Sequence, residues 1–192
     1  RVDHRRFVVG GALSNGGNLA QWLKETMQLE DLSSYDPQLL AARPAEHGLT
    51  VLPFWAGERS PGWAADATGA ILGLRLHTRP LDLLQACMEA VAYRFSLIFE
   101  RLLQTVPRID SLVATGGGLL RSRSWLQIIC DTLNRPIQVS GELEASSRGA
   151  ALVALEAMGV WDDLKDIPSA LGATYTPRPG YHEMHMEARE KQ

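Results

Sequence analysis

The sequence is poor in cysteine and aromatic residues (7% aromatic), and it lacks long runs of one charge sign or of apolar residues. Its two cysteines, Cys87 and Cys130, lie in apolar helical segments, which favours buried reduced thiols over a disulfide or a metal site. The five histidines form no spaced ligand set, and we expect His182 and His185 to be solvated in a polar C-terminal stretch. The sequence therefore predicts no metal centre.

Basic clusters and long apolar segments are missing as well. The net charge is −3 and the longest basic block is the Arg5-Arg6 pair, so nucleic acid is a poor candidate partner. No apolar stretch reaches the roughly 18–20 residues of a membrane span, and no signal peptide opens the chain. We expect a cytoplasmic protein without a membrane or nucleic-acid partner. The sequence leaves open whether the protein forms a homodimer.

What the sequence does contain is enough apolar surface for a core. Hydrophobic residues make up 45% of 192 residues, which suits one domain. We expect that domain to cover residues 1–176 and a peripheral polar tail to cover residues 177–192. Because the chain starts almost inside an apparent strand, it looks like a piece of something longer.

Apolar periodicity predicts strands that alternate with helices. The predicted strands are Phe7–Leu13, Leu49–Phe54, Ile109–Ala114 and Ile137–Ser140. The predicted helices are Asn18–Met27 with Asn18 as its cap, Leu81–Gln104, Ser124–Leu133, and Ser147–Met158 with a capping hydroxyl. The long helix is apolar around most of its circumference, which indicates burial on more than one side. The pattern favours an α/β domain whose sheet is covered by helices.

A triple glycine follows the third predicted strand, in Thr115–Gly118. Glycine can adopt positive φ and expose backbone N–H groups, and the following helix turns its positive end toward the same place. Such a turn suits a phosphate. We expect a side chain at the middle glycine, Gly117, to strain the turn and obstruct that approach.

Four motifs together resemble the FGGY carbohydrate kinases. The segment Gly69–Leu74 followed by Asp82–Glu89 is similar to that family's second signature, with Cys87 as a mild departure. The loop Gly57–Trp63, the turn Thr115–Gly118 and the segment Glu144–Ala151 are also similar to the family's. They occur in the family's order, and the match extends over residues 7–159.

The resemblance implies a ribonuclease H-like, actin-like ATPase fold with a mixed sheet flanked by helices. It also implies two domains around an active-site cleft, with ATP and Mg²⁺ as cofactors. This chain resembles the carboxy-terminal domain, which holds most of the ATP. The catalytic aspartate and the sugar site belong to the amino-terminal domain, so no catalytic residue is assigned here; Asp3 has no motif around it.

Site residues carry over by motif. The family's Gly-x-x-x-Gln-Trp segment, which approaches the phosphates, falls on residues 17–22, and the second glycine turn falls on residues 116–118. Arg121 takes the place of an asparagine near adenine in glycerol kinases, and either stacks on the base or points to solvent. The resemblance thus assigns nucleotide contacts to Gly17, Gln21, Gly116, Gly117, Gly118 and Arg121.

Three alternatives stay open. Glu58 and Arg59 either line an interdomain cleft or pair with each other. The protein is either an ATP-dependent sugar kinase, inactive as this segment alone, or a non-enzymatic nucleotide-binding switch or assembly module of the same fold. Among kinases, the Asn15-Gly16-Gly17 segment and the Gly57–Trp63 loop look more like gluconate or xylulose kinases than glycerol kinases.

Overall fold

A long central helix dominates the computed structural model, which describes residues 6–142 and 144–192. This helix, α3 (Pro80–Thr105), starts with proline in its first turn, and the Asp82 carboxylate accepts a hydrogen bond from the backbone N–H of Arg79 at 2.8 Å. Every residue from Leu83 to Tyr93 is buried. The prediction of a helix buried on more than one side is confirmed.

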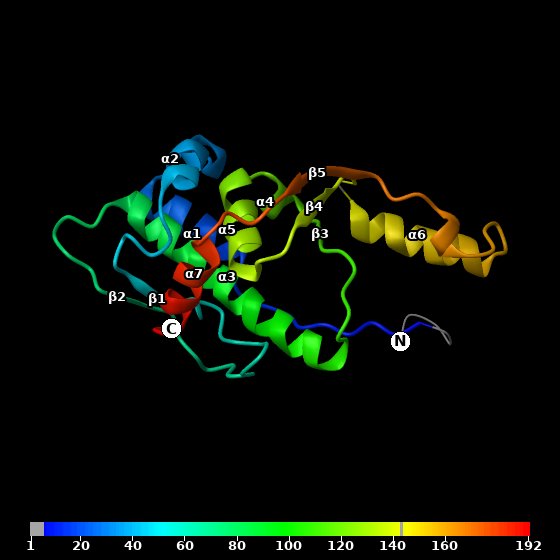
Figure 1. The fold of residues 1–192 in the computed structure, drawn as a ribbon, viewed down its shortest axis with the longest axis horizontal. Coiled ribbons are helices and arrows are strands. Elements are labelled where there is room, and N and C mark those ends of the chain that lie inside the picture. Colours follow the sequence, from blue (N-terminus) through cyan, green and yellow to red (C-terminus); the bar gives the residue numbers. More distant parts are fainter. Residues whose placement is uncertain (1–5, 143) are drawn as a thin grey trace.

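Several of the other helices gather around α3 (Figure 1). Helices α1, α5 and α7 pack against α3, and α2 packs against α5. Their bounds, with those of α4, α6 and two short 3₁₀ turns, are α1 Gly17–Met27, η1 Leu32–Tyr35, α2 Asp36–Ala41, α4 Gly117–Leu120, α5 Arg123–Leu133, α6 Ala145–Ala157, η2 Leu164–Asp166 and α7 Tyr181–Arg189. None of these described helices is long and apolar enough to cross a bilayer. Both cysteines are free and buried, as expected.

Two small sheets accompany the helices. In one, β1 (Thr50–Leu52) pairs antiparallel with β2 (Ala70–Leu72). In the other, β4 (Ile137–Ser140) lies between its parallel neighbour β3 (Val113–Ala114) and its antiparallel neighbour β5 (Leu171–Tyr175). The α/β class with a mixed sheet is therefore observed, although β3 covers only the end of the strand predicted over residues 109–114.

The strand predicted for Phe7–Leu13 is wrong for the described residues. The segment is not assigned as a strand, and Phe7 and Val8 are 67% and 72% exposed. Ser60 holds its end: the Ser60 Oγ accepts from the Ala12 N–H at 3.0 Å, and the Ser60 N–H donates to the Ala12 carbonyl at 2.9 Å. Strand propensity is present, but a strand also requires a partner.

The tail after Pro177 was expected to be peripheral, and this is wrong. Helix α7 packs on α5 and α3, and His185 is only 1% exposed. Arg178 donates from its backbone N–H and its Nε to the fully buried Asp131 carboxylate, at 2.7 and 2.8 Å, and from Nη1 to the Leu40 carbonyl at 2.7 Å. His182 lies 3.0 Å from the Thr132 carbonyl, so neither tail histidine is simply solvated.

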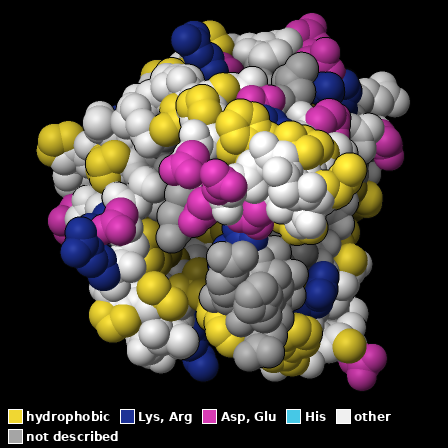
Figure 2. Space-filling model, turned by 90° about the vertical axis from the view of Figure 1, so that its right-hand side faces the viewer, with side chains coloured by type: hydrophobic (Ala, Val, Ile, Leu, Met, Phe, Trp, Pro, Cys, Tyr) yellow, Lys and Arg dark blue, Asp and Glu magenta, His cyan; other side chains and the backbone are white. Residues whose placement is uncertain are grey.

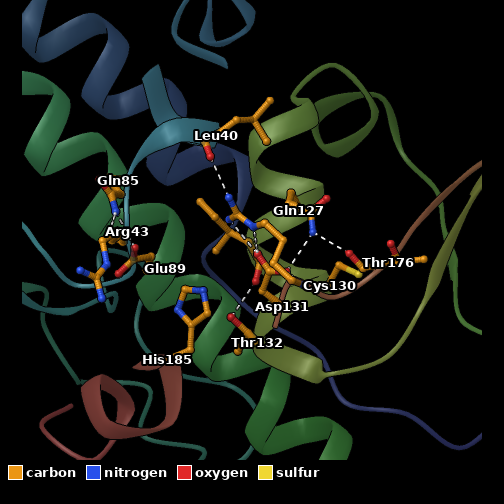
Figure 3. A network of polar contacts seen from close by, with 12 residues as sticks. Leu40, Arg43, Gln85, Glu89, Gln127, Cys130, Asp131, Thr132, Thr176 and His185 are labelled. Atoms are coloured by element: carbon orange, nitrogen blue, oxygen red, sulfur yellow. Dashed lines mark hydrogen bonds and ion pairs between the residues drawn. The ribbon is translucent and has the colours of Figure 1, made fainter. Parts of the chain in front are cut away.

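His185 faces charged groups from two helices (Figure 3). Glu89 on α3 lies to one side of it, and Asp131 on α5 lies to the other. Burial lowers the pKa of His185, and the two carboxylates offset part of this effect. The C-terminal segment is thus built into the core rather than laid on its surface.

Helix α6 extends away from the rest of the molecule (Figure 1). It has no fully buried residue among those described, and a Cβ added to Gly149 would meet nothing within 4 Å. Its first turn has Glu144 as the N-cap without a side-chain bond, so the capping hydroxyl is wrong. Figure 2, viewed from this end, shows hydrophobic and acidic side chains side by side, and Met158 and Trp161 are exposed there.

Candidate functional site

The start of α1 is fixed by a buried asparagine. The Asn15 Nδ2 donates to the Gly57 carbonyl at 2.8 Å, and its Oδ1 accepts from the Ala56 N–H at 2.9 Å. The helix then begins at Gly17, with Gly16 as an N-cap that has no side-chain cap. Asn18, the predicted cap, lies inside the helix and accepts from the Gly16 N–H at 2.7 Å.

One face of α1 forms a wall of a cavity of about 330 Å³. Gly17, Gln21 and Lys24 are spaced by four and three residues, so a helix places them on one side. The remaining lining residues are Ala20, Asp31, Leu32, Ser33, Arg121 and Trp125. The volume lies at the lower end of the range for small-molecule sites.

The cavity carries more positive than negative charge. Lys24 forms an ion pair with Asp31, and both line the cavity with Arg121. The hydrogen bond from Lys24, then its charge, lowers the pKa of Asp31, and Arg121 adds to this. Two cations against one carboxylate suit an anionic or planar aromatic ligand.

The glycine turn joins β3 to α4. Gly116 is the N-cap of α4 with φ 98° and ψ 130°, and Gly117 is the first helical residue. A Cβ added at either position would meet nothing within 4 Å, so both backbones face open space. The positive φ falls on Gly116, so the expectation that Gly117 is the strained position is wrong. Gly118 lies within α4, of which Arg121 is the C-cap.

The structure brings at least three of the six assigned residues together. Gly17, Gln21 and Arg121 line one cavity, whereas Gly116 and Gly117 are not among its described lining residues and lead into Arg121 through α4. Sequence reasoning missed Lys24 and Trp125. Lys24 follows Gln21 by three residues on the same helix face, a spacing that was available as a signal.

Trp125 comes from α5 and lines the cavity. It is 3% exposed, and its indole Nε1 donates to the Met88 carbonyl on α3 at 3.1 Å. Because the ring is held by the central helix, this wall is rigid. A signal for Trp125 existed only as an apolar position of a predicted helix, which does not distinguish a cavity wall from core.

Glu58 has a different ion-pair partner from the one expected if it pairs with Arg59. It forms an ion pair with Arg94 on α3 rather than with Arg59, and the Arg94 guanidinium lies 5.1 Å from the centre of the Phe54 ring. Burial lowers the pKa of Arg94. The pair therefore secures the Gly57–Trp63 loop to the core.

The described residues include no group of three or more His, Cys, Asp or Glu side chains that could hold a metal ion. The N-terminus of α1 at Gly17 and the two cations of the cavity, Lys24 and Arg121, fit a phosphorylated ligand. Backbone N–H groups at a helix N-terminus and arginine side chains both bind phosphates.

A family model decides the identity of the domain. The model for the C-terminal domain of the FGGY family of carbohydrate kinases matches residues 1–158. The chain belongs to this family. The FGGY chain is 31% identical over 185 residues to glycerol kinase 1 from Thermotoga maritima, covering 94% of itself and 38% of that relative. It is 27% identical to the gluconokinase of Bacillus subtilis, covering 93% of itself and 37% of the relative.

Solved structures agree with this assignment. The xylulose kinase from Rhodospirillum rubrum superposes with a TM-score of 0.74 at 30% identity, over 94% of this chain and 37% of the other. The xylulose kinase from Lactobacillus acidophilus reaches a TM-score of 0.82 at 24% identity over 94% and 37%, a likeness of fold. The FGGY chain thus spans less than two-fifths of the length of these relatives.

Proposed function

We propose that this chain is the nucleotide-binding domain of an FGGY sugar kinase, with a ribonuclease H-like, actin-like ATPase fold. The full-length protein transfers the γ-phosphoryl group of Mg-ATP to a hydroxyl of a sugar or sugar acid. The observation that supports the proposal most is the cavity lined by Gly17, Gln21 and Arg121, because the motif resemblance assigns nucleotide contacts to these three residues and the fold places them around one cavity.

Each part of the cavity has a role in this proposal. The planar Arg121 guanidinium stacks on the base, and Trp125 limits how deep the base enters. The first turn of α1, an 11-residue helix without a side-chain cap, presents backbone N–H groups to phosphate oxygens. The glycines of the Gly116–Gly118 turn allow the polyphosphate to approach the backbone closely.

The sugar class is gluconate or xylulose in this proposal. Gluconokinases and xylulose kinases are among the similar proteins, as are glycerol kinases, so motif detail rather than overall similarity carries the choice. The sugar pocket, the catalytic base and the Mg²⁺ ligands lie outside the described residues of this chain. Its own residues bind and orient the nucleotide.

The experiment compares two arginines of one turn. Arg121→Ala removes the side chain that lines the cavity, whereas Arg123→Ala removes an exposed neighbour and keeps its backbone N–H. Calorimetric titration with ATP should show about a tenfold weaker affinity for Arg121→Ala. Arg123→Ala should bind like the unmodified chain. Equal affinities for all three proteins would contradict the site.

A further inference from the structure

Asp36 is a buried acid that is not among the described lining residues of the cavity. It connects two segments that do line it, η1 and the start of α5. It is 7% exposed and accepts four hydrogen bonds, all from the start of α5. Its Oδ1 accepts from the Ser124 N–H at 2.9 Å, the Ser124 Oγ at 2.6 Å and the Ser122 Oγ at 3.3 Å, and its Oδ2 accepts from the Arg123 N–H at 3.1 Å. All four hydrogen bonds to the carboxylate therefore come from three consecutive residues, Ser122 to Ser124.

The bonds continue into α5 through Ser122. This residue is fully buried and is the N-cap of the helix, where its Oγ accepts from the Trp125 N–H at 3.2 Å and donates to Asp36. A negative charge near a helix N-terminus is also favoured by the helix dipole. Asp36 therefore fixes the first turn of α5, from which Trp125 projects.

Asp36 also holds a second segment that lines the cavity. It directly follows η1, and Leu32 and Ser33 of that turn line the cavity. Arg121, another lining residue, directly precedes Ser122. One carboxylate therefore ties the segment that carries Ser33 to the segment that carries Arg121 and Trp125.

Helix capping alone does not account for this arrangement, because Ser122 already caps α5. We propose that Asp36 is a positioning residue for the nucleotide cavity, acting through Ser122 and Ser124 on the separation of Ser33 from Arg121. The inference rests on the proposed function. It assigns to Asp36 an effect on nucleotide affinity that is separate from its effect on stability.

The test uses the whole chain and ATP as the probe. Asp36→Asn keeps the shape but loses the charge and half of the accepting capacity. Ser124→Ala removes the 2.6 Å bond to Asp36 and the 3.1 Å bond between the Ser124 and Ser122 hydroxyls, and keeps the other bonds of Asp36. The matched control is Asp131→Asn, which weakens a buried acid elsewhere on α5, away from the cavity. Urea unfolding gives the stability of each variant, and calorimetry gives its ATP affinity under conditions in which it is folded.

The expected result is a graded one. Affinity should fall about tenfold in Asp36→Asn and by about two- to threefold in Ser124→Ala, while Asp131→Asn loses stability but binds ATP normally. If Asp36→Asn does not fold, Ser124→Ala decides. If the wild type binds ATP and the Asp36 and Ser124 variants bind it with the same affinity, the inference is overturned and the proposed function is not. A wild-type chain that does not bind ATP would overturn the proposed function and the inference with it.

Discussion

At the scale of single residues, Gly116 holds a backbone conformation that other residues adopt only at a cost. Its φ of 98° with ψ of 130° contrasts with its neighbour Gly117, which is helical. Both have open space where a Cβ would lie. The two glycines therefore separate the effect of strain from the effect of an added methyl group.

We predict that Gly116→Ala lowers the free energy of unfolding by about 1–3 kcal/mol, the cost of one residue in such a region. Gly117→Ala should change it little, because its φ is ordinary and the methyl group meets nothing. Thermal unfolding of both variants measures the difference. Equal stabilities would mean that the turn does not hold Gly116 at positive φ.

His185 makes the stability of the domain depend on pH. Its folded-state pKa is lowered by burial, so the unfolded chain takes up a proton first as the pH falls through the ordinary histidine range near 6.5. Unfolding free energy should therefore be lower at pH 5.5 than at pH 7.5, by an amount that His185→Gln reduces.

The matched control for this prediction is His77→Gln, since His77 is exposed. It should leave the pH dependence as it is in the unmodified chain. Urea unfolding at the two pH values measures all three proteins. A His185 variant with the full wild-type pH dependence would show that the histidine takes up its proton equally in the folded and unfolded chain.

At the scale of elements, an ion pair with a buried carboxylate anchors the segment that leads into the C-terminal helix. Arg178 and Asp131 lie 47 residues apart, and the Asp131 side chain is fully buried. Arg178→Ala should lower the free energy of unfolding by about 3 kcal/mol, because it leaves a buried carboxylate without its cation.

Arg108→Ala is the control for that variant. Its partner Asp110 is 75% exposed, so the loss should be below about 1 kcal/mol. Chemical denaturation checks both. Similar losses in the two variants would mean that the tail is not anchored through Arg178.

Helices could be predicted from the sequence better than strands or burial. Predicted residues 81–104 and 124–133 became α3 and α5 with small shifts, because helical hydrogen bonds and apolar spacing are local. Phe7–Leu13 has strand composition but is not assigned as a strand, because strand formation requires pairing, which is not local. His185 seemed solvated because its burial depends on α3 and α5, which are distant in sequence.

The candidate site was partly predictable for the same reason. Gly17, Gln21 and Arg121 came from motifs, and the fold brings them to one cavity. Asp36 could not be found, since nothing in its local sequence reveals four donors that lie more than 80 residues away.

At the scale of the whole molecule, the chain covers less than two-fifths of the relatives it resembles. We predict that residues 1–192 alone phosphorylate neither gluconate nor xylulose. General-base catalysis is worth about 10²–10⁴-fold, and positioning of the sugar contributes further. Coupled detection of ADP release checks this. Sugar-dependent turnover at an ordinary enzymatic rate would contradict the assignment of the base and sugar site to another part of the protein.

The central claim is that nucleotide binds between α1 and the glycine turn, and an ATP titration followed by backbone amide NMR tests it most directly. We predict weak binding, of about millimolar affinity, because charge-assisted contacts worth roughly 1.5–3 kcal/mol each are supplied from elsewhere in the full protein. Shifts should cluster in residues 15–24 and 115–125. Shifts confined to other surfaces, or none at high ATP concentration, would contradict the claim.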